Sequence, residues 1–148
     1  MPTADETQAA LSYELAIYRE QIAMIKRETE RVSLTTMDLA NALRTVEDMS
    51  AEKVLIPIGG GTLAKGTISE TRVLVPLGAE YMVEMEKGDA ELELKRRIDA
   101  TRNAVEKLNE EFGKIAQKVR EISSQLQQLQ NQNRLSQQVE SNIREDYI

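Results

Sequence analysis

The feature that most constrains the fold is a heptad repeat that runs through two long stretches of the chain. Neither proline nor glycine occurs between Thr3 and Met49. From Asp89 onward there is no proline, and Gly113 is the single glycine. Unbroken heptads of this length are typical of coiled-coil helices rather than of globular helices. The core positions of the first stretch are Gln8, Leu11, Leu15, Tyr18, Ile22, Ile25, Thr29, Val32, Thr36, Leu39, Leu43 and Val46. Those of the second stretch are Leu94, Ile98, Thr101, Val105, Leu108, Phe112, Ile115, Val119, Ile122, Leu126 and Leu129.

The two stretches predict an antiparallel coiled coil, because the chain can turn back through the segment between them. The register that closes this hairpin near Ser50 and Asp89 pairs Thr36 with Thr101, so that two threonines meet in the seam. A slip by one heptad, which pairs Thr29 with Thr101, satisfies the pattern nearly as well. The register is therefore left open to within one heptad.

The ends of the two predicted helices carry different signals. The sequence Thr3-Ala4-Asp5-Glu6 fits a capping box, in which the first and fourth residues bond to each other's backbone amides at a helix start. In the favoured register the second helix overhangs the first from about Asn131 onward. The segment from Gln125 to Gln138 is rich in glutamine, and we expect the overhang to form a frayed, adaptable tip.

The middle of the chain contains a duplicated β-hairpin. The sequence Val54–Gly59 recurs nineteen positions later as Val73–Gly78, and a second candidate strand follows each copy, at 62–68 and 80–86. Four short strands without a covering helix cannot close a core, so their faces and edges need other chains. A charge at Val75 is therefore expected to break assembly. The candidate assembly residues are Val54, Ile56, Ile58, Val73, Val75, Leu77, Tyr81 and Val83.

Together these patterns predict an α+β fold, a long antiparallel two-helix coiled coil joined by two β-hairpins that assemble into an intersubunit β-barrel. We expect one structural unit with three regions. Residues 1–50 form the N-terminal coiled-coil helix, and residues 51–88 form the double-hairpin assembly region. Residues 89–148 form the C-terminal coiled-coil helix with its distal tip.

Composition argues against catalysis and against several ligands. The chain has no histidine and no cysteine, which removes thiolate nucleophiles, Cys/His zinc sites and Ser-His triads. The segment Gly59–Ala64 matches G-x-G-x-x-A, but no helix follows it to receive a pyrophosphate. Its net charge of −6 argues against nucleic-acid binding as the primary role. We expect no enzyme activity, cofactor or metal.

The expected compartment is the cytoplasm. No stretch approaches the roughly 20 apolar residues needed to span a bilayer, and the sequence after Met1 lacks the basic flank and apolar run of a signal peptide. The chain is therefore expected to have no membrane partner.

Some apolar residues lie outside the heptad seam. Tyr13, Ile17 and Met24 are predicted to face away from the partner helix, and further apolar residues follow the end of the seam. Scattered exposed apolar residues are normal on a protein surface, and Leu34 and Met37 are also off the seam. Apolar groups at the end of a solvated arm would nevertheless suit weak binding to the exposed apolar segments of many different proteins.

The order helix, doubled hairpin, helix, with V-L-[IV]-P-[IL]-G opening each hairpin and a glycine-rich turn after the first, resembles the prefoldin α class. The β class has a single hairpin. The resemblance implies a hexamer of two α and four β subunits, whose hairpins form a double β-barrel. It also implies that coiled-coil tips hold non-native proteins without nucleotide and pass them to a group II chaperonin. The implied substrate-binding residues are Leu11, Tyr13, Ile17, Leu135, Val139 and Ile143.

Two alternatives stay open at this point. The chain could form a structural homo-oligomer or filament through its hairpins, with the helices as spacers. It could also act as an adaptor whose coiled coil binds one folded partner helix. The ending Glu145-Asp146-Tyr147-Ile148 departs from the family pattern, and the sequence assigns it no role.

Overall fold

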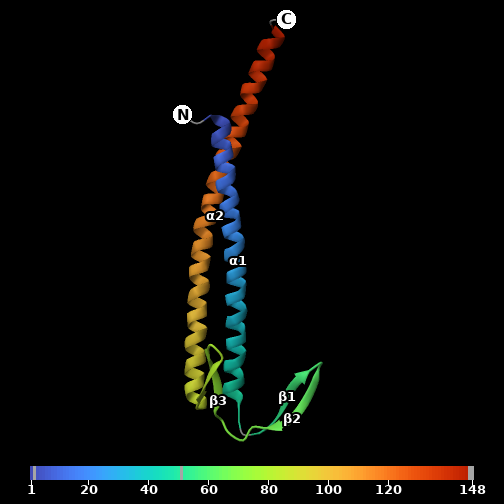
Figure 1. Ribbon diagram of the computed structural model, residues 1–148, viewed down its shortest axis with the longest axis vertical. Helices are drawn as coiled ribbons and strands as arrows, with labels where there is room; N and C mark the ends of the chain where they lie inside the picture. The colour runs from blue at the N-terminus through green and yellow to red at the C-terminus, as the bar shows by residue number, and fades with distance from the viewer. Residues whose placement is uncertain (2, 51, 147–148) are drawn as a thin grey trace. The chain divides into compact units, whose positions relative to one another are not determined.

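The computed structural model describes residues 1, 3–50 and 52–146, so Tyr147 and Ile148 of the unusual ending lie outside the described residues. The helix α1 (Ala4–Asp48) is followed by four strands and by the helix α2 (Lys87–Asp146) (Figure 1). The strands are β1 (Lys53–Gly59), β2 (Thr62–Thr67), β3 (Val73–Gly78) and β4 (Tyr81–Met85). They form two separate antiparallel sheets, β1–β2 and β3–β4. The predicted fold class of two long helices and two hairpins is confirmed.

By its contacts the chain divides into two compact units. One comprises Met1–Glu30 of α1 and the part of α2 from Glu106 onward, and the other comprises Arg31–Val105. Helix pairing occurs within each unit, and both hairpins belong to the second. Each unit is therefore stabilised by its own stretch of heptad seam.

The first turn of α1 is closed by the capping box that the sequence predicts. The backbone amide of Thr3 donates to Oε2 of Glu6 at 2.8 Å, and the amide of Glu6 donates to Oγ1 of Thr3 at 3.3 Å. These two bonds satisfy amides that have no partner within the helix. The start of α1 is thus fixed by local chemistry.

The heptad seam is confirmed in both helices. Every predicted core position is buried or half-buried, whereas most other helix residues are exposed. In the unit Arg31–Val105 the hydroxyl oxygens of Thr36 and Thr101 lie 2.8 Å apart, and Thr101 donates onward to the carbonyl of Ile98 at 2.9 Å. This contact confirms the favoured register there and contradicts the pairing of Thr29 with Thr101. In the other unit, Lys26 Nζ lies 5.7 Å from the centre of the Phe112 ring, as the same register requires.

Cysteine pairs test this register in the unit that contains both chain ends. We expect the double variant Ile22→Cys/Ile115→Cys to form a disulfide on mild oxidation, because the register places these seam positions opposite each other. The slipped register would instead place Ile22 opposite Leu108. A disulfide in Ile22→Cys/Leu108→Cys, with none in the first pair, would show that the register is wrong. Mobility on a non-reducing gel provides the measurement.

The two hairpins share one backbone plan. In each, the strand pairing shifts after the proline, between Pro57 and Gly59 in one and between Pro76 and Gly78 in the other. Both turns use a left-handed backbone, which glycine adopts without steric cost. The first turn places Gly60 and Gly61 there, but the second places Ala79 (φ 48°) and Glu80 (φ 65°) there. The second turn therefore carries local strain that the first avoids.

Replacing the strained pair should stabilise the second hairpin. We expect Ala79→Gly/Glu80→Gly to raise the free energy of unfolding by about 1 kcal/mol, because relief of left-handed strain outweighs the added chain entropy of glycine. Thermal unfolding followed by circular dichroism measures the change. Glu80→Val serves as the opposite control and should lower the midpoint, because a β-branched residue tolerates this conformation poorly. Equal midpoints for all three proteins would contradict the strain argument.

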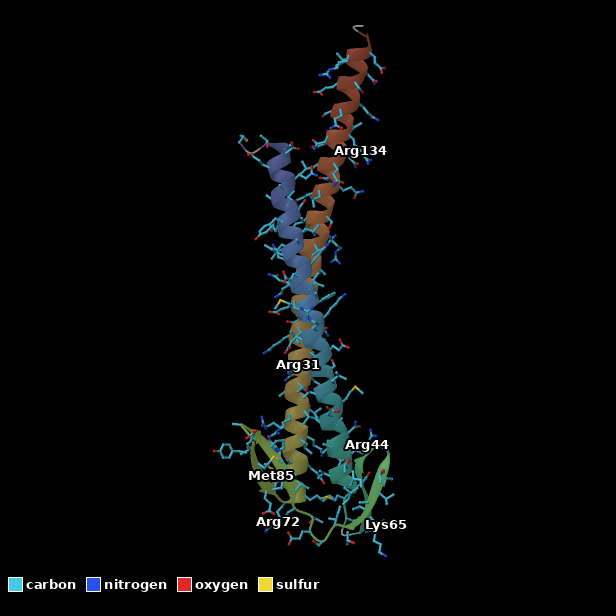
Figure 2. The ribbon with its side chains drawn as sticks, turned by 45° about the vertical axis from the view of Figure 1, so that its right-hand side comes forward. Arg31, Arg44, Lys65, Arg72, Met85 and Arg134 are labelled. Carbon is cyan, nitrogen blue, oxygen red and sulfur yellow. The ribbon has the colours of Figure 1, made fainter. Side chains whose placement is uncertain are left out.

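The best-buried cluster joins the second hairpin to both helices. Val46 of α1, Val75 of β3, and Ala90 and Leu94 of α2 are its buried members. Val73, Val83 and Met85 pack against it from the hairpin, and Figure 2 shows Met85 beside the first turns of α2. Burial of this face fixes the hairpin β3–β4 on the helices. The partly buried helix residues around the cluster are Leu39 and Leu43.

The end of α1 is closed by a residue from α2. Lys87 Nζ donates to the backbone carbonyls of Glu47 at 2.8 Å and Met49 at 3.2 Å. Because α1 has no basic residue in its own last turn, Lys87 supplies the positive charge that suits a helix C-terminus. This contact ties the two helices together beside the hairpins.

The expectation of a frayed tip is wrong for the backbone, which is helical as far as Asp146. The segment after Asn131 has neither glycine nor proline and is rich in good helix formers such as Gln, Arg and Leu, so helix propensity persists after the seam ends. Over the described residues, neither helix has a stretch apolar enough to cross a membrane.

Candidate assembly and capture surfaces

Three apolar residues form a stripe near the end of α2, which we call the overhang stripe: Leu135, Val139 and Ile143. Residues four apart lie on one side of a helix, so the stripe spans about 12 Å along the axis. Their exposed fractions are 62%, 56% and 53%. No α1 residue covers them, because α1 begins at Ala4 and α2 continues past it (Figure 1). The stripe is available to bind something outside the chain.

The other predicted capture residues lie on α1. Tyr13 and Ile17 are exposed on the side of the helix away from the seam. Leu11 occupies a core position and is half-buried. All three residues share a unit with the overhang stripe, but Leu11 mainly packs the coiled coil. Their roles in capture stay predictions.

Figure 2 marks Arg134 on α2 directly before the overhang stripe. Polar side chains surround the stripe, including the glutamines that precede it. The charged residues Arg134, Glu140 and Arg144 also lie beside the stripe. An apolar strip with such mixed polar borders can contact apolar chain segments without demanding a particular sequence. The surroundings therefore suit broad rather than selective binding.

The predicted assembly residues differ in burial and fall into three groups. Val73, Val75 and Val83 pack in the chain's own core, where Val75 is only 4% exposed. A charge at Val75 would therefore disrupt the subunit itself before it affected any contact between subunits. Val54 is half-buried. The exposed members, which are available to other chains, are Ile56, Ile58, Leu77 and Tyr81.

The hairpins also expose apolar residues that the sequence analysis did not single out. Leu55 and Leu63 lie on one face of β1–β2, and Leu74 and Met82 lie on the matching face of β3–β4. The unbroken apolar run in β1 and β3 was the sequence signal that could have identified these exposed residues. Strands that are apolar at successive positions bury both faces, whereas alternating strands bury one.

Ion pairs organise two charged regions of the unit Arg31–Val105. Arg72 donates to Glu86 at 2.9 Å and to Glu84 at 3.5 Å, and the hydrogen bond that it donates to Glu86 raises the pKa of Arg72. Hydrogen bonds from Arg96, the larger cause, and from Arg97 lower the pKa of Glu93 to about 2. Glu93, Arg96 and Arg97 all lie on α2, so these pairs form within one helix, whereas Lys95 Nζ lies 3.9 Å from the Glu47 carboxylate of α1. Over the described residues, no group of three or more Asp or Glu side chains is arranged to hold a metal ion.

The family model described as "Prefoldin subunit" matches residues 18–132, which is most of the chain. The chain belongs to the prefoldin family. The prefoldin subunit alpha of Methanococcus aeolicus is 26% identical over 81% of the chain and 88% of that relative. The prefoldin subunit alpha of Pyrobaculum islandicum is 30% identical over 78% of the chain and 89% of that relative. The resemblance to the α class is thus confirmed.

Two solved structures share the fold. A chain of the filamentous prefoldin from Methanocaldococcus jannaschii, solved by cryo-electron microscopy, aligns with a TM-score of 0.64 at 19% identity. The alignment covers 74% of the present chain and 95% of that chain. The prefoldin beta subunit from Thermococcus strain KS-1, a crystal structure, aligns with a TM-score of 0.60 at 19% identity and covers 86% and 96%. Prefoldin subunits are chaperone subunits that assemble with one another, and this general role applies to the chain.

Proposed function

We propose that the chain is an α-class prefoldin subunit that holds non-native proteins without ATP, using apolar residues near the two chain ends. The overhang stripe carries this proposal, because three large apolar side chains lie on one side of a helix with no partner to cover them. Exposing apolar side chains to water costs free energy, and a cluster of them on a surface often marks a binding site. Tyr13 and Ile17 extend the same apolar character onto α1.

Weak capture by each chain becomes effective when several chains act together. A stripe of three side chains offers too little area for tight binding by itself. The family resemblance implies two α and four β subunits, so that one non-native protein would meet several arms. Simultaneous binding by linked arms raises the effective affinity without any new kind of contact.

The open hairpins support the assembly part of the proposal. Each sheet has only two strands and exposes large apolar side chains, so hairpins from different subunits would complete a barrel. Delivery of the held protein to a group II chaperonin in the cytoplasm rests on the family resemblance.

Site-specific photo-cross-linking tests where a non-native protein is held. A photoreactive residue at Val139 should cross-link to a denatured test protein diluted into the assembled complex without ATP. The control position is Leu34, an exposed apolar residue of α1 in the other unit. Strong cross-linking at Leu34 with none at Val139 would show that capture occurs elsewhere on the chain.

The alternative of a structural homo-oligomer or filament rests on the same exposed hairpins. Native mass spectrometry distinguishes this alternative from the proposed chaperone subunit, because the proposal requires a closed complex that contains a second type of prefoldin subunit. An adaptor coiled coil would instead bind one folded partner and leave the aggregation of unfolded proteins unchanged.

A further inference from the structure

One heptad of the contact between α1 and α2 lacks a carboxylate. Lys95 Nζ of α2 lies 3.9 Å from the Glu47 carboxylate of α1. Because the helices are antiparallel, the equivalent pair one heptad farther from the hairpins joins position 40 to position 102. These positions hold Ala40 and Arg102. Arg102 thus has an alanine as its counterpart on α1, where Lys95 has a glutamate.

An open groove of about 460 Å³ follows this gap between the two helices. Three cations line it, Arg44, Lys95 and Arg102, together with two carboxylates, Glu47 and Asp99. The remaining lining residues are apolar. Every lining residue belongs to the unit Arg31–Val105, so the groove lies within one compact part of the chain. Three cations against two carboxylates leave an excess of one positive charge, although the chain as a whole has a net charge of −6.

Two of the three cations have no carboxylate partner. Lys95 lies beside Glu47, whereas Arg44 and Arg102 form no ion pair in the part of the chain that the structure describes. Asp99 precedes Arg102 by three residues on α2 and forms no ion pair there either. Figure 2 marks Arg44 in the last turns of α1. The groove therefore has one exposed, unpaired guanidinium group on each helix.

We propose that this groove binds a small phosphate-type anion between Arg44 and Arg102, in the place of the missing carboxylate. A guanidinium group presents paired N–H donors that match two oxygens of a phosphate. The short side chain of Ala40 leaves the space beside Arg102 open. One arginine from each helix would hold the anion, which would join α1 to α2 as Glu47 and Lys95 do one heptad away. Asp99 repels the anion and lowers its affinity.

Binding of the anion should stabilise the folded chain, because the unfolded chain does not bring the two arginines together. We expect phosphate at about ten times its dissociation constant to raise the midpoint of thermal unfolding of the full-length chain by about 3 °C, relative to chloride at equal ionic strength. Isothermal titration calorimetry measures the affinity and should give one anion per chain. Low ionic strength is required, since salt screens exposed charges.

Pyrophosphate provides a second arm of the titration that identifies the source of the phosphate group. Binding about tenfold tighter than that of phosphate would indicate that the groove takes larger phosphate compounds, because a second phosphate group reaches a further cation such as Lys95. Equal binding would indicate that a single phosphate group fills the groove.

Substitutions within the groove should change the affinity in opposite directions. Arg44→Gln and Arg102→Gln should each weaken phosphate binding about tenfold, because each removes charge-assisted hydrogen bonds. Asp99→Asn should strengthen it, because the repelling carboxylate is lost. Ala40→Glu supplies the missing carboxylate from α1. It should raise the unfolding midpoint without phosphate and remove the response to phosphate.

The control removes an arginine from an exposed part of α2 outside the groove. Arg134→Gln changes the net charge by the same amount as Arg102→Gln and should keep the wild-type affinity. Circular dichroism confirms that each variant keeps its helices. The proposal is overturned if phosphate acts no differently from chloride on the wild-type chain. Equal weakening by Arg134→Gln and Arg102→Gln overturns it as well, because binding would then follow net charge rather than this groove.

Discussion

The substitution Val75→Asp should destabilise the chain by more than about 3 kcal/mol, because it places an unpaired carboxylate among buried apolar side chains. Val75 is 4% exposed and packs with Val46, Ala90 and Leu94, so the new charge would lie among apolar side chains. For a chain of this size the midpoint of thermal unfolding should fall by about 10 °C. Circular dichroism at low protein concentration measures this fall in the separate chain.

The duplication supplies the matched control for this variant. Ile56→Asp makes the same chemical change at the equivalent position of β1–β2, where the side chain is half exposed. We expect it to leave the unfolding midpoint nearly unchanged and to reduce assembly with partner subunits. Equal destabilisation by the two variants would show that both hairpins are anchored alike, which would contradict the observed packing.

The triple substitution Leu135→Gln/Val139→Gln/Ile143→Gln should remove most of the capacity to hold a non-native protein. Glutamine keeps the helix propensity and removes the apolar surface, so the effect acts on capture rather than on folding. We expect about tenfold more complex to be needed for the same protection, because each arm loses its main apolar contact. Light scattering from an aggregating test protein measures the protection.

The control for the triple variant removes apolar surface elsewhere. Leu34→Gln/Met37→Gln changes two exposed apolar residues of α1 that lie outside the capture surface. It should leave protection unchanged. Equal loss of protection in both variants would mean that exposed apolar area in general, rather than the overhang stripe, determines capture. Native mass spectrometry checks that both variants still assemble.

The sequence predicts those parts of the fold that repeat or act locally. Every residue that heptad spacing placed in the seam is buried or half-buried. The capping box at Thr3 and Glu6 formed as expected because its bonds involve only neighbouring residues. The two threonines in the seam indicated the register, since a buried hydroxyl needs a partner. These features succeed because each depends on residues whose spatial relation follows directly from helix geometry.

The sequence analysis did not separate the two hairpins, since their opening strands are nearly identical. What separates them lies in the second strands, where Val83 and Met85 replace Ala64 and Gly66. Larger side chains let β3–β4 bury its inner face on the helices. Whether such a face meets its own chain or another depends on long-range packing, which strand patterns do not report. For this reason the sequence placed Val75 among the assembly residues, whereas its side chain packs in the chain's own core.

At the end of α2 the sequence predicted the exposed residues but not the state of the backbone. Loss of the heptad seam after Leu129 suggested fraying, but the helix continues because its residues favour helix without a partner. The exposed stripe was nevertheless identifiable, since Leu135, Val139 and Ile143 recur at a spacing of four. The position of the candidate capture surface could thus be predicted, although the state of its backbone could not.

Light scattering from a denatured protein, diluted into buffer with the assembled complex and no ATP, tests the central claim most directly. The account predicts that scattering falls nearly to zero at about one complex per test protein, and that added nucleotide changes nothing. Unchanged scattering with an intact complex would contradict it, because the chain would then share the architecture of prefoldin without holding non-native proteins.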